Sequence, residues 1–347
     1  MCVLADVSIL RSPFMGKFIV KRLLLCVVIF FFAMFLIYTL IYNLPSSYVE
    51  TTARELAAAT SKMGGKNYQE WLAQLNEQYG MNKGVVAGYF TWLGNALKGD
   101  FGDSWKWNMP CTAKFAACIW NSFTLGLVAF VFEILIAIPL GVVAAKKQYS
   151  ITDYTVTVVS LIGISLPTFF MATVLKLIFA INLGWFDIGG MHSKFFIASN
   201  ATQWENILDL AKHFVLPALT LIFISIGGLM RYTRTNMLEV LNADYIRTAR
   251  AKGLSESKVI GYHAFRNTLI PVVTLLGGTL PGLFSGALIT ETLFSIEGIG
   301  YVSYNSMISG DIPFTMFYLA LMSVLTLLGN LISDILYAVV DPRVRVN

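Results

Sequence analysis

Residues 243–271 read ADYIRTARAKGLSESKVIGYHAFRNTLIP, a polar and basic stretch enclosed by two long apolar segments. The pattern predicts a helix that continues to Lys252, a break, and a second helix. Gly253 suits the left-handed position that ends a helix, and Ser255 followed by Glu256 suits the start of the next one. We call residues 243–271 the elbow.

The first predicted helix of the elbow has two kinds of surface. Tyr245, Ile246 and Ala249 share one face, while Arg247 and Arg250 lie to its side. A short helix of this kind, with small residues near a tight turn, can lie in a groove of a partner protein and transmit a rigid-body movement. The alternative is a basic loop that only orients the chain, because such loops are common on the inner side of membranes.

The composition of the whole chain is that of a membrane protein. Of its 347 residues, 56% are hydrophobic and 13% are charged, whereas water-soluble domains have fewer apolar and more charged residues. The net charge of +5 is spread along the sequence. This distribution fits basic loops at a membrane surface rather than a nucleic-acid footprint.

Six apolar segments are long enough to cross a bilayer, which takes about 20 helical residues. They cover residues 18–42, 119–145, 154–182, 213–232, 268–293 and 313–340. The alternating pattern of barrel strands is absent, and open strands would leave backbone groups unpaired in lipid. The sequence therefore predicts an all-α polytopic membrane protein.

Basic residues near the ends of these segments predict the orientation of the chain. Those that fall on one side are Lys17, Lys21, Arg22, Lys146, Lys147, the basic residues from Arg231 to Arg266, Arg343 and Arg345. Both termini, residues 1–17 and 341–347, are therefore expected to be cytoplasmic tails.

The same orientation divides the remaining chain. After the first transmembrane helix at 18–42, residues 43–118 form a predicted extracellular segment, with a short amphipathic helix at 68–79. Residues 119–340 form a five-helix core that includes a cytoplasmic loop at 233–268. Residues 183–212 are expected to be mostly loop.

The fifth apolar segment has small residues at intervals of four: Thr274, Gly278, Gly282, Gly286 and Thr290. On one helix they would form a stripe along one face, which suits close packing against another helix. Packing within the bundle is favoured over lining a passage or a seam with a second chain. Pro281 in this segment, and Pro167 with Gly163 in the third, are expected to produce kinks.

The sequence shows no pattern of a catalytic or metal site. It lacks the G-x-x-x-x-G-K-[ST] phosphate loop, so energy from ATP would have to come from another polypeptide. Its four cysteines and three histidines lack the spacing of a disulfide framework or a zinc site. The acids in or near the apolar segments, Glu133, Glu291 and Asp334, have no evident catalytic partner.

Two further classes of protein remain open from the residues alone. One is an ion-coupled secondary transporter that works alone, with Glu133 or Asp334 as its titrating group. The other is a membrane-embedded scaffold without cargo.

Several stretches carry a more specific resemblance. In the elbow they are DYIRTARAKGLS at 244–255, HAFRN at 263–267 and LIP at 269–271. Elsewhere they are WLGNALKGDFG at 92–102, IPLGVVAA at 138–145, SLPTFF at 165–170, LGW at 183–185, ETLFSIEGIGY at 291–301 and LYAVVDPRVR at 336–345. The elbow resembles the "EAA" loop of binding-protein-dependent ABC permeases, and the whole set is similar to the first permease of the oligopeptide, dipeptide and nickel subfamily. The segment from about 48 to 70 looks like an insertion in that family's pattern.

This resemblance implies a type I ABC importer permease with six transmembrane helices, in the plasma (inner) membrane of a bacterial cell. It implies that the elbow docks on an ATP-binding subunit. The residues that match this coupling loop are Asp244, Tyr245, Arg247, Thr248, Ala249, Ala251, Gly253 and Leu254. The small residues of the fifth segment, with Pro281, are the candidates for helix packing or for the pathway.

The resemblance also implies the partners. They are a second, similar permease, two ATP-binding subunits and an extracellular or periplasmic peptide-binding protein. No cofactor is expected on this chain, because ATP and magnesium would be bound by the ATP-binding subunits, and the chain is not expected to be an enzyme. The implied cargo is an oligopeptide or dipeptide, with nickel or a heme-like compound as the alternative within the family.

Overall fold

The computed structural model describes residues 13–43, 48–60, 66–79, 81–193, 196 and 201–340. The described chain divides into two compact units. The core unit consists mainly of Asn121–Gly298, and the N-terminal unit consists of residues up to Trp120 together with Ile299–Leu328. Apart from a short antiparallel pair, β1 (Asp103–Ser104) and β2 (Met109–Pro110), the elements are helices, as predicted.

Four helices of the described chain are long and apolar enough to cross a membrane, and a bent pair is a fifth candidate. The four are α1 (Pro13–Tyr42), α5 (Cys111–Lys146), α8 (Gln203–Leu241) and α14 (Ile312–Val340). Their apolar parts include Leu23–Tyr42 of α1 and Ile312–Leu331 of α14. These five candidates correspond to five of the six predicted spans.

The third predicted span is a bent pair rather than one rod. The helix α6 (Ile151–Ser165) and the helical stretch Thr168–Asn182 meet at an angle of 104°. The second stretch consists of α7 (Thr168–Leu175) and the π-helical η4 (Lys176–Asn182). Leu166 is extended, with φ −82° and ψ 130°, because the ring of Pro167 disfavours the helical conformation of the residue before it.

The fifth predicted span, 268–293, is wrong as a single helix. It contains α11 (Phe265–Thr279), the 3₁₀ turn η6 (Leu280–Phe284) and α12 (Leu288–Leu293). We call the non-α-helical stretch between α11 and α12, residues 280–287, the interruption. Proline cannot donate the backbone hydrogen bond of an α-helix, and glycines weaken helices further, so Pro281 among several glycines ends α11.

The expected stripe of small residues therefore does not exist as one helix face. Gly278 lies in α11, Gly282 in η6, and Gly286 lies between η6 and α12 with a φ of +77°. Gly278 and Gly282 are exposed in the chain. The side chain of Pro281 lies outside the described residues.

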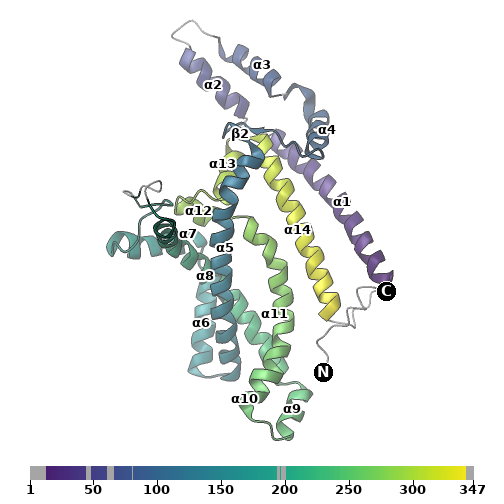
Figure 1. Cartoon of the computed structure of the whole chain (residues 1–347), viewed down its shortest axis with the longest axis vertical. Helices are drawn as coiled ribbons and strands as arrows, with labels where there is room; N and C mark the ends of the chain where they lie inside the picture. Colours follow the sequence, from purple (N-terminus) through teal and green to yellow (C-terminus); the bar gives the residue numbers. More distant parts are fainter. Residues whose placement is uncertain are drawn as a thin grey trace. The chain divides into compact units, whose positions relative to one another are not determined.

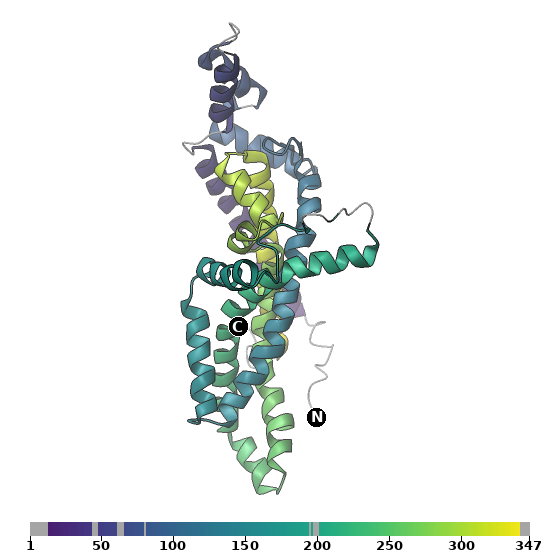
Figure 2. The ribbon, with the colours of Figure 1, turned by 90° about the vertical axis from the view of Figure 1, so that its left-hand side faces the viewer.

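The core unit is organised around α8. The helices α6, α7 and α11 pack against it, and α6 and α8 run side by side in both views (Figures 1 and 2). Gly163 of α6 permits this close approach, because an added Cβ would lie 2.7 Å from the carbonyl oxygen of Phe223. Arg234 of α8 also donates two hydrogen bonds to the Asp153 carboxylate of α6, at 2.6 and 2.8 Å.

The segment 183–212 contains more helix than predicted. Its last part belongs to α8, which begins at Gln203, ten residues before the predicted fourth span. A capping box starts the helix: the Glu205 backbone N–H donates to the Thr202 hydroxyl, and the Thr202 backbone N–H donates to the Glu205 carboxylate. The pair satisfies backbone donors that the first turn leaves free.

The N-terminal unit contains the predicted amphipathic helix at 68–79. The structure has α3 (Tyr68–Gln78) there, with a capping box made by Asn67 and Glu70. Besides α1 and most of α14, this unit contains the short helices α2 (Tyr48–Thr60), η3 (Met81–Lys83), α4 (Gly84–Ala96) and α13 (Ile299–Ile308). The helices α2 and α3 form a hairpin around the buried residues Val49, Ala53 and Leu75 (Figure 1).

A buried carboxylate stabilises the turn between β1 and β2. Asp311, at the start of α14, accepts hydrogen bonds from the Ser104 hydroxyl and from the backbone N–H groups of Trp105 and Phe314. Burial raises the pKa of Asp311, although these hydrogen bonds oppose the shift. These hydrogen bonds therefore join the turn to the N-terminal end of α14.

Candidate functional site at the elbow

The elbow has the helix, break and helix that its sequence predicts. The first helix is α9 (Asp244–Ala251), with Lys252 as its C-cap. Gly253 follows with a φ of +76°, and the extended Ser255 precedes α10 (Glu256–Lys258). The π-helical η5 (Val259–Ala264) then leads directly into α11. In both views α9 and α10 form one end of the core unit (Figures 1 and 2).

Gly253 is required by its backbone conformation and not by crowding. An added Cβ at this position would meet no atom within 4 Å. The left-handed conformation, however, strains any residue that carries a Cβ, and β-branched residues most of all. A substitution here would therefore change the turn without causing a collision.

One face of α9 is anchored to the core unit. Ile246 is fully buried and Ala249 nearly so, and both pack in a cluster with Val259, Ile260 and Ala264 of η5. The end of α8 and the end of α5 contribute to the same cluster. Burial of this face holds α9 against the ends of α5 and α8, two of the helices that are long and apolar enough to cross a membrane.

Tyr245 is far more exposed than Ile246 and Ala249, the two residues with which it is predicted to share a helical face. Its side chain is 48% exposed, whereas that of Ile246 is 0% exposed. Successive residues on a helix are about 100° apart, so Tyr245 lies at the margin of a narrow buried stripe. An exposed aromatic ring beside the anchored face is a common contact group in protein interfaces.

The predicted coupling residues separate into an outer surface and an inner support. The exposed ones are Asp244, Tyr245, Arg247, Thr248, Ala251 and Gly253. Ala249 is buried, and Leu254 is half-buried against the same cluster as Ile246. The outer surface combines charged groups, one aromatic ring and small residues, so it can contact a partner protein.

An ion pair across the break was not predicted from the sequence. Arg250 of α9 donates two hydrogen bonds to the Glu256 carboxylate of α10, at 3.1 Å from Nε and 2.7 Å from Nη2. The hydrogen bonds raise the pKa of Arg250 and lower that of Glu256. Arg250 and Glu256 lie on either side of Gly253 in the sequence. Their opposite charges were the only feature from which this ion pair could have been predicted.

Other ionisable residues singled out in the sequence lie apart from the elbow. Glu291 of α12 is fully buried, and its Oε1 accepts hydrogen bonds from the Ser122 hydroxyl at 2.6 Å and from the Ala287 backbone at 2.9 Å. Glu133 is half-buried on α5. The side chain of Asp334 lies outside the described residues. Among the residues that the structure describes, no group of three or more His, Cys, Asp or Glu residues is placed to hold a metal.

The chain is similar to known proteins over most of its length. Residues 137–346, which include the elbow, match the family described as "Binding-protein-dependent transport system inner membrane component". The oligopeptide transport system permease protein AppB of Bacillus subtilis is 40% identical over 287 residues, or 82% of this chain and 89% of AppB. The oligopeptide transport system permease protein OppB of Haemophilus influenzae is 36% identical over 277 residues, or 80% of this chain and 86% of OppB. The dipeptide transport system permease protein DppB of Escherichia coli is 33% identical over 345 residues, or 95% of this chain and 99% of DppB.

Proposed function

The chain belongs to the family of binding-protein-dependent transport system inner membrane components, and from this premise we propose that it is a permease subunit of an ATP-driven peptide importer. The observation that carries the proposal is its 33 to 40% identity to proteins named as oligopeptide and dipeptide permeases. That similarity extends over 80 to 95% of the chain. An ion-coupled transporter that works alone is not favoured, because these relatives are named as permeases of transport systems.

The elbow is the proposed contact with an ATP-binding subunit. Its support comes from two properties of α9: the inner face is anchored through Ile246 and Ala249, and the outer face is exposed. A force applied to the outer face passes to α8 and α11, because η5 continues into α11 and packs on α9. Movement of an ATP-binding subunit would therefore move the membrane helices.

The interruption is proposed to border the translocation pathway. Backbone that is not helical is tolerated at membrane depth only where it is covered by protein or lines a water-filled cavity. Gly282 is exposed and half-buried residues follow it as far as Ala287, so this stretch of the chain is open on at least one side. Counting α11, the interruption and α12 as one broken crossing gives six crossings, with both termini and the elbow on the cytoplasmic side.

The proposed assembly follows the family description. A second permease would supply the other half of the pathway, two ATP-binding subunits would hold ATP and magnesium, and a peptide-binding protein outside the membrane would deliver cargo. The assembly would lie in the plasma (inner) membrane of a bacterial cell. Alternating access results if the ATP-bound and ATP-free states favour different arrangements of the helices.

Purification of the chain with its natural partners tests this function. We expect ATPase subunits to co-purify, and the complex in lipid vesicles to accumulate peptide only when ATP and the peptide-binding protein are present. Peptide accumulation by this chain alone, driven by a proton or sodium gradient, would contradict the proposal. So would a complex that hydrolyses ATP and moves nickel but not peptide.

A further inference from the structure

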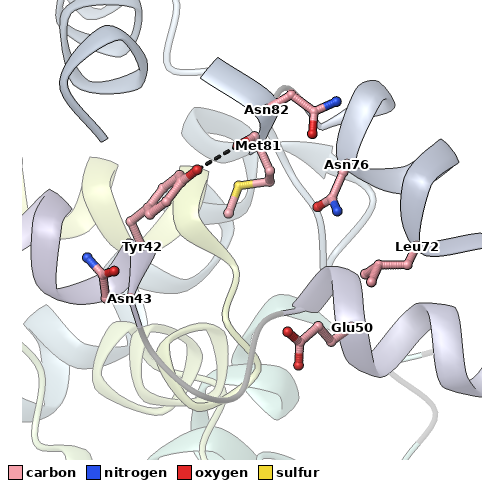
Figure 3. A pocket seen from close by; sticks show the side chains of 7 residues that line it. All are labelled: Tyr42, Asn43, Glu50, Leu72, Asn76, Met81 and Asn82. Atoms are coloured by element: carbon pink, nitrogen blue, oxygen red, sulfur yellow. Dashed lines mark hydrogen bonds between the residues drawn. The ribbon is translucent and has the colours of Figure 1, made fainter. Parts of the chain in front are cut away.

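A polar pocket of about 300 Å³ lies within the N-terminal unit (Figure 3). Four successive elements form it: the end of α1, α2, α3 and η3. Each element contributes at least one side chain, so the pocket depends on how these four elements pack together. The helix α2 belongs to the segment that looks like an insertion in the family's pattern.

Glu50 of α2 gives the pocket its charge. Among the residues that the structure describes, no Lys, Arg or His side chain lines the pocket, and three carboxamides, those of Asn43, Asn76 and Asn82, surround the same space. Arg54 stands 3.8 Å from the Glu50 carboxylate, but its own side chain is 72% exposed. Arg54 does not line the pocket, so the Glu50 carboxylate carries the charge on the pocket wall.

The pocket is held open by contacts on both sides. The Tyr42 hydroxyl donates a hydrogen bond of 2.6 Å to the Met81 carbonyl oxygen, which joins the end of α1 to η3 (Figure 3). On the other side, Val49 of α2 and Leu75 of α3 are buried against each other. These contacts fix the wall residues without using the Glu50 carboxylate.

The carboxamides are available to a ligand. Within the described chain, the side chains of Asn76 and Asn82 make no hydrogen bond, and that of Asn43 uses only its Nδ2, which donates to the Thr39 carbonyl oxygen at 2.7 Å. A carboxamide both donates and accepts, which matches the N–H and C=O of a peptide group. Leu72 and Met81 add apolar surface to the same space.

We propose that this pocket binds the amino-terminal end of a short peptide, with Glu50 pairing with the α-ammonium group. The carboxamides of Asn76 and Asn82 bond the first peptide group, and Leu72 with Met81 contacts the first side chain. The volume is at the lower end of ligand pockets, which span about 300 to 1,000 Å³, so it suits one end of a peptide. The peptide identity of the ligand rests on the proposed function.

A bound calcium ion is the main competing ligand. Calcium takes six to eight oxygen ligands and prefers several carboxylates. The pocket offers one carboxylate, that of Glu50, and the remaining oxygens belong to neutral groups. An organic ammonium with a neighbouring amide fits this set of groups better than a divalent cation does.

Binding of trialanine to the purified full-length chain in detergent tests the pocket. We expect saturation-transfer NMR to detect bound trialanine, and N-acetyl-trialanine, which lacks the ammonium group, to bind at least about tenfold more weakly. Glu50→Gln should weaken trialanine binding by a similar factor. Glu55→Gln, an exposed position of the same helix outside the pocket, should leave it unchanged.

Asn76→Ala provides a second variant, which should weaken trialanine and N-acetyl-trialanine alike because it removes a bond to the peptide group. Circular dichroism on each variant ensures that only folded proteins are compared. Equal affinity for the two peptides, an effect of Glu55→Gln as large as that of Glu50→Gln, or displacement of trialanine by calcium chloride would overturn the proposal.

ATP-driven uptake by the assembled importer separates this proposal from the proposed function. If the complex imports trialanine but Glu50→Gln binds it normally, the pocket assignment fails and the importer function stands. If the chain binds trialanine as described but the complex does not import peptide, the importer function fails.

Discussion

The elbow and the interruption are both breaks in helical structure, and each contains a glycine in the left-handed region. Gly253 has a φ of +76° and Gly286 a φ of +77°. The elbow joins helices whose inner faces are buried at Ile246 and Val259. The interruption is longer than the turn at Gly253, since a 3₁₀ turn at Leu280–Phe284 and three further non-helical residues separate α11 from α12. A tight turn can transmit force between the helices that it joins, whereas a longer non-helical stretch can change shape, and the two therefore suit a lever and a gate.

Removing the anchor of the elbow should produce the largest effect. Ile246→Ala deletes a fully buried side chain, which costs about 2 to 4 kcal/mol at such positions. We expect hydrogen exchange of the α9 amides to accelerate strongly, and ATP-driven uptake to fall with it. Tyr245→Ala, at the exposed neighbouring position, should leave exchange unchanged but weaken binding of the ATP-binding subunit. Normal exchange in Ile246→Ala would show that α9 does not depend on this anchor.

Straining the turn of the elbow should have the next largest effect. Gly253→Val places a β-branched residue in the left-handed region, at a cost of about 1 to 2 kcal/mol. We expect ATP hydrolysis to continue in the assembled importer while peptide uptake falls by at least about tenfold. Gly261→Ala is the matched control, because a Cβ there also meets no atom within 4 Å and its φ is not in the left-handed region. Undiminished uptake by Gly253→Val would contradict the coupling role.

A glycine-to-valine substitution in the interruption should reduce peptide uptake without releasing the ATP-binding subunits. Gly286→Val again strains a left-handed position, but the interruption is longer than the turn at Gly253 and can distribute the strain over more residues, so we expect only a several-fold loss of uptake. Gly282→Ala should be nearly neutral, since its Cβ meets no atom within 4 Å. Co-purification measures retention of the subunits. If Gly286→Val loses these subunits, the distinction between lever and gate is wrong.

Sequence predicted the elbow well because its signals are local. A glycine followed by Ser255 and Glu256 specifies an end and a start within a few residues, and the burial of Ile246 and Ala249 follows from helical spacing. The amphipathic helix at 68–79 was predicted for the same reason. Such features can be predicted without knowing which other parts of the chain pack against them.

The sequence predicted a kink at Pro281 but not the full extent of the interruption, because the other signals were ambiguous. Small residues every four positions fit a helix stripe as well as a series of breaks, and only the packing of the surrounding chain decides between them. The 104° bend at Pro167 is a similar case, since the sequence predicts a kink but not its angle. The carboxamide pocket could not be predicted either, because Glu50 and Asn76 meet only through the α2–α3 hairpin.

The ion pair across the elbow should give the smallest effect, and pH reveals it. Hydrogen bonds from Arg250 lower the pKa of Glu256 in the folded chain, so the pair stabilises the elbow above the unfolded pKa of Glu, about 4.3, and is lost as pH falls through the lower folded value. Because both side chains are exposed, the contribution is small and weakens with salt. We expect the amide resonance of Gly253 to shift as pH is lowered through this range in ¹⁵N-glycine-labelled protein, and Glu256→Gln to remove the shift. Asp244→Asn, which leaves the pair intact, should retain it. A shift that persists in Glu256→Gln would assign the titration to another group and leave the rigidity of the elbow to the buried face of α9.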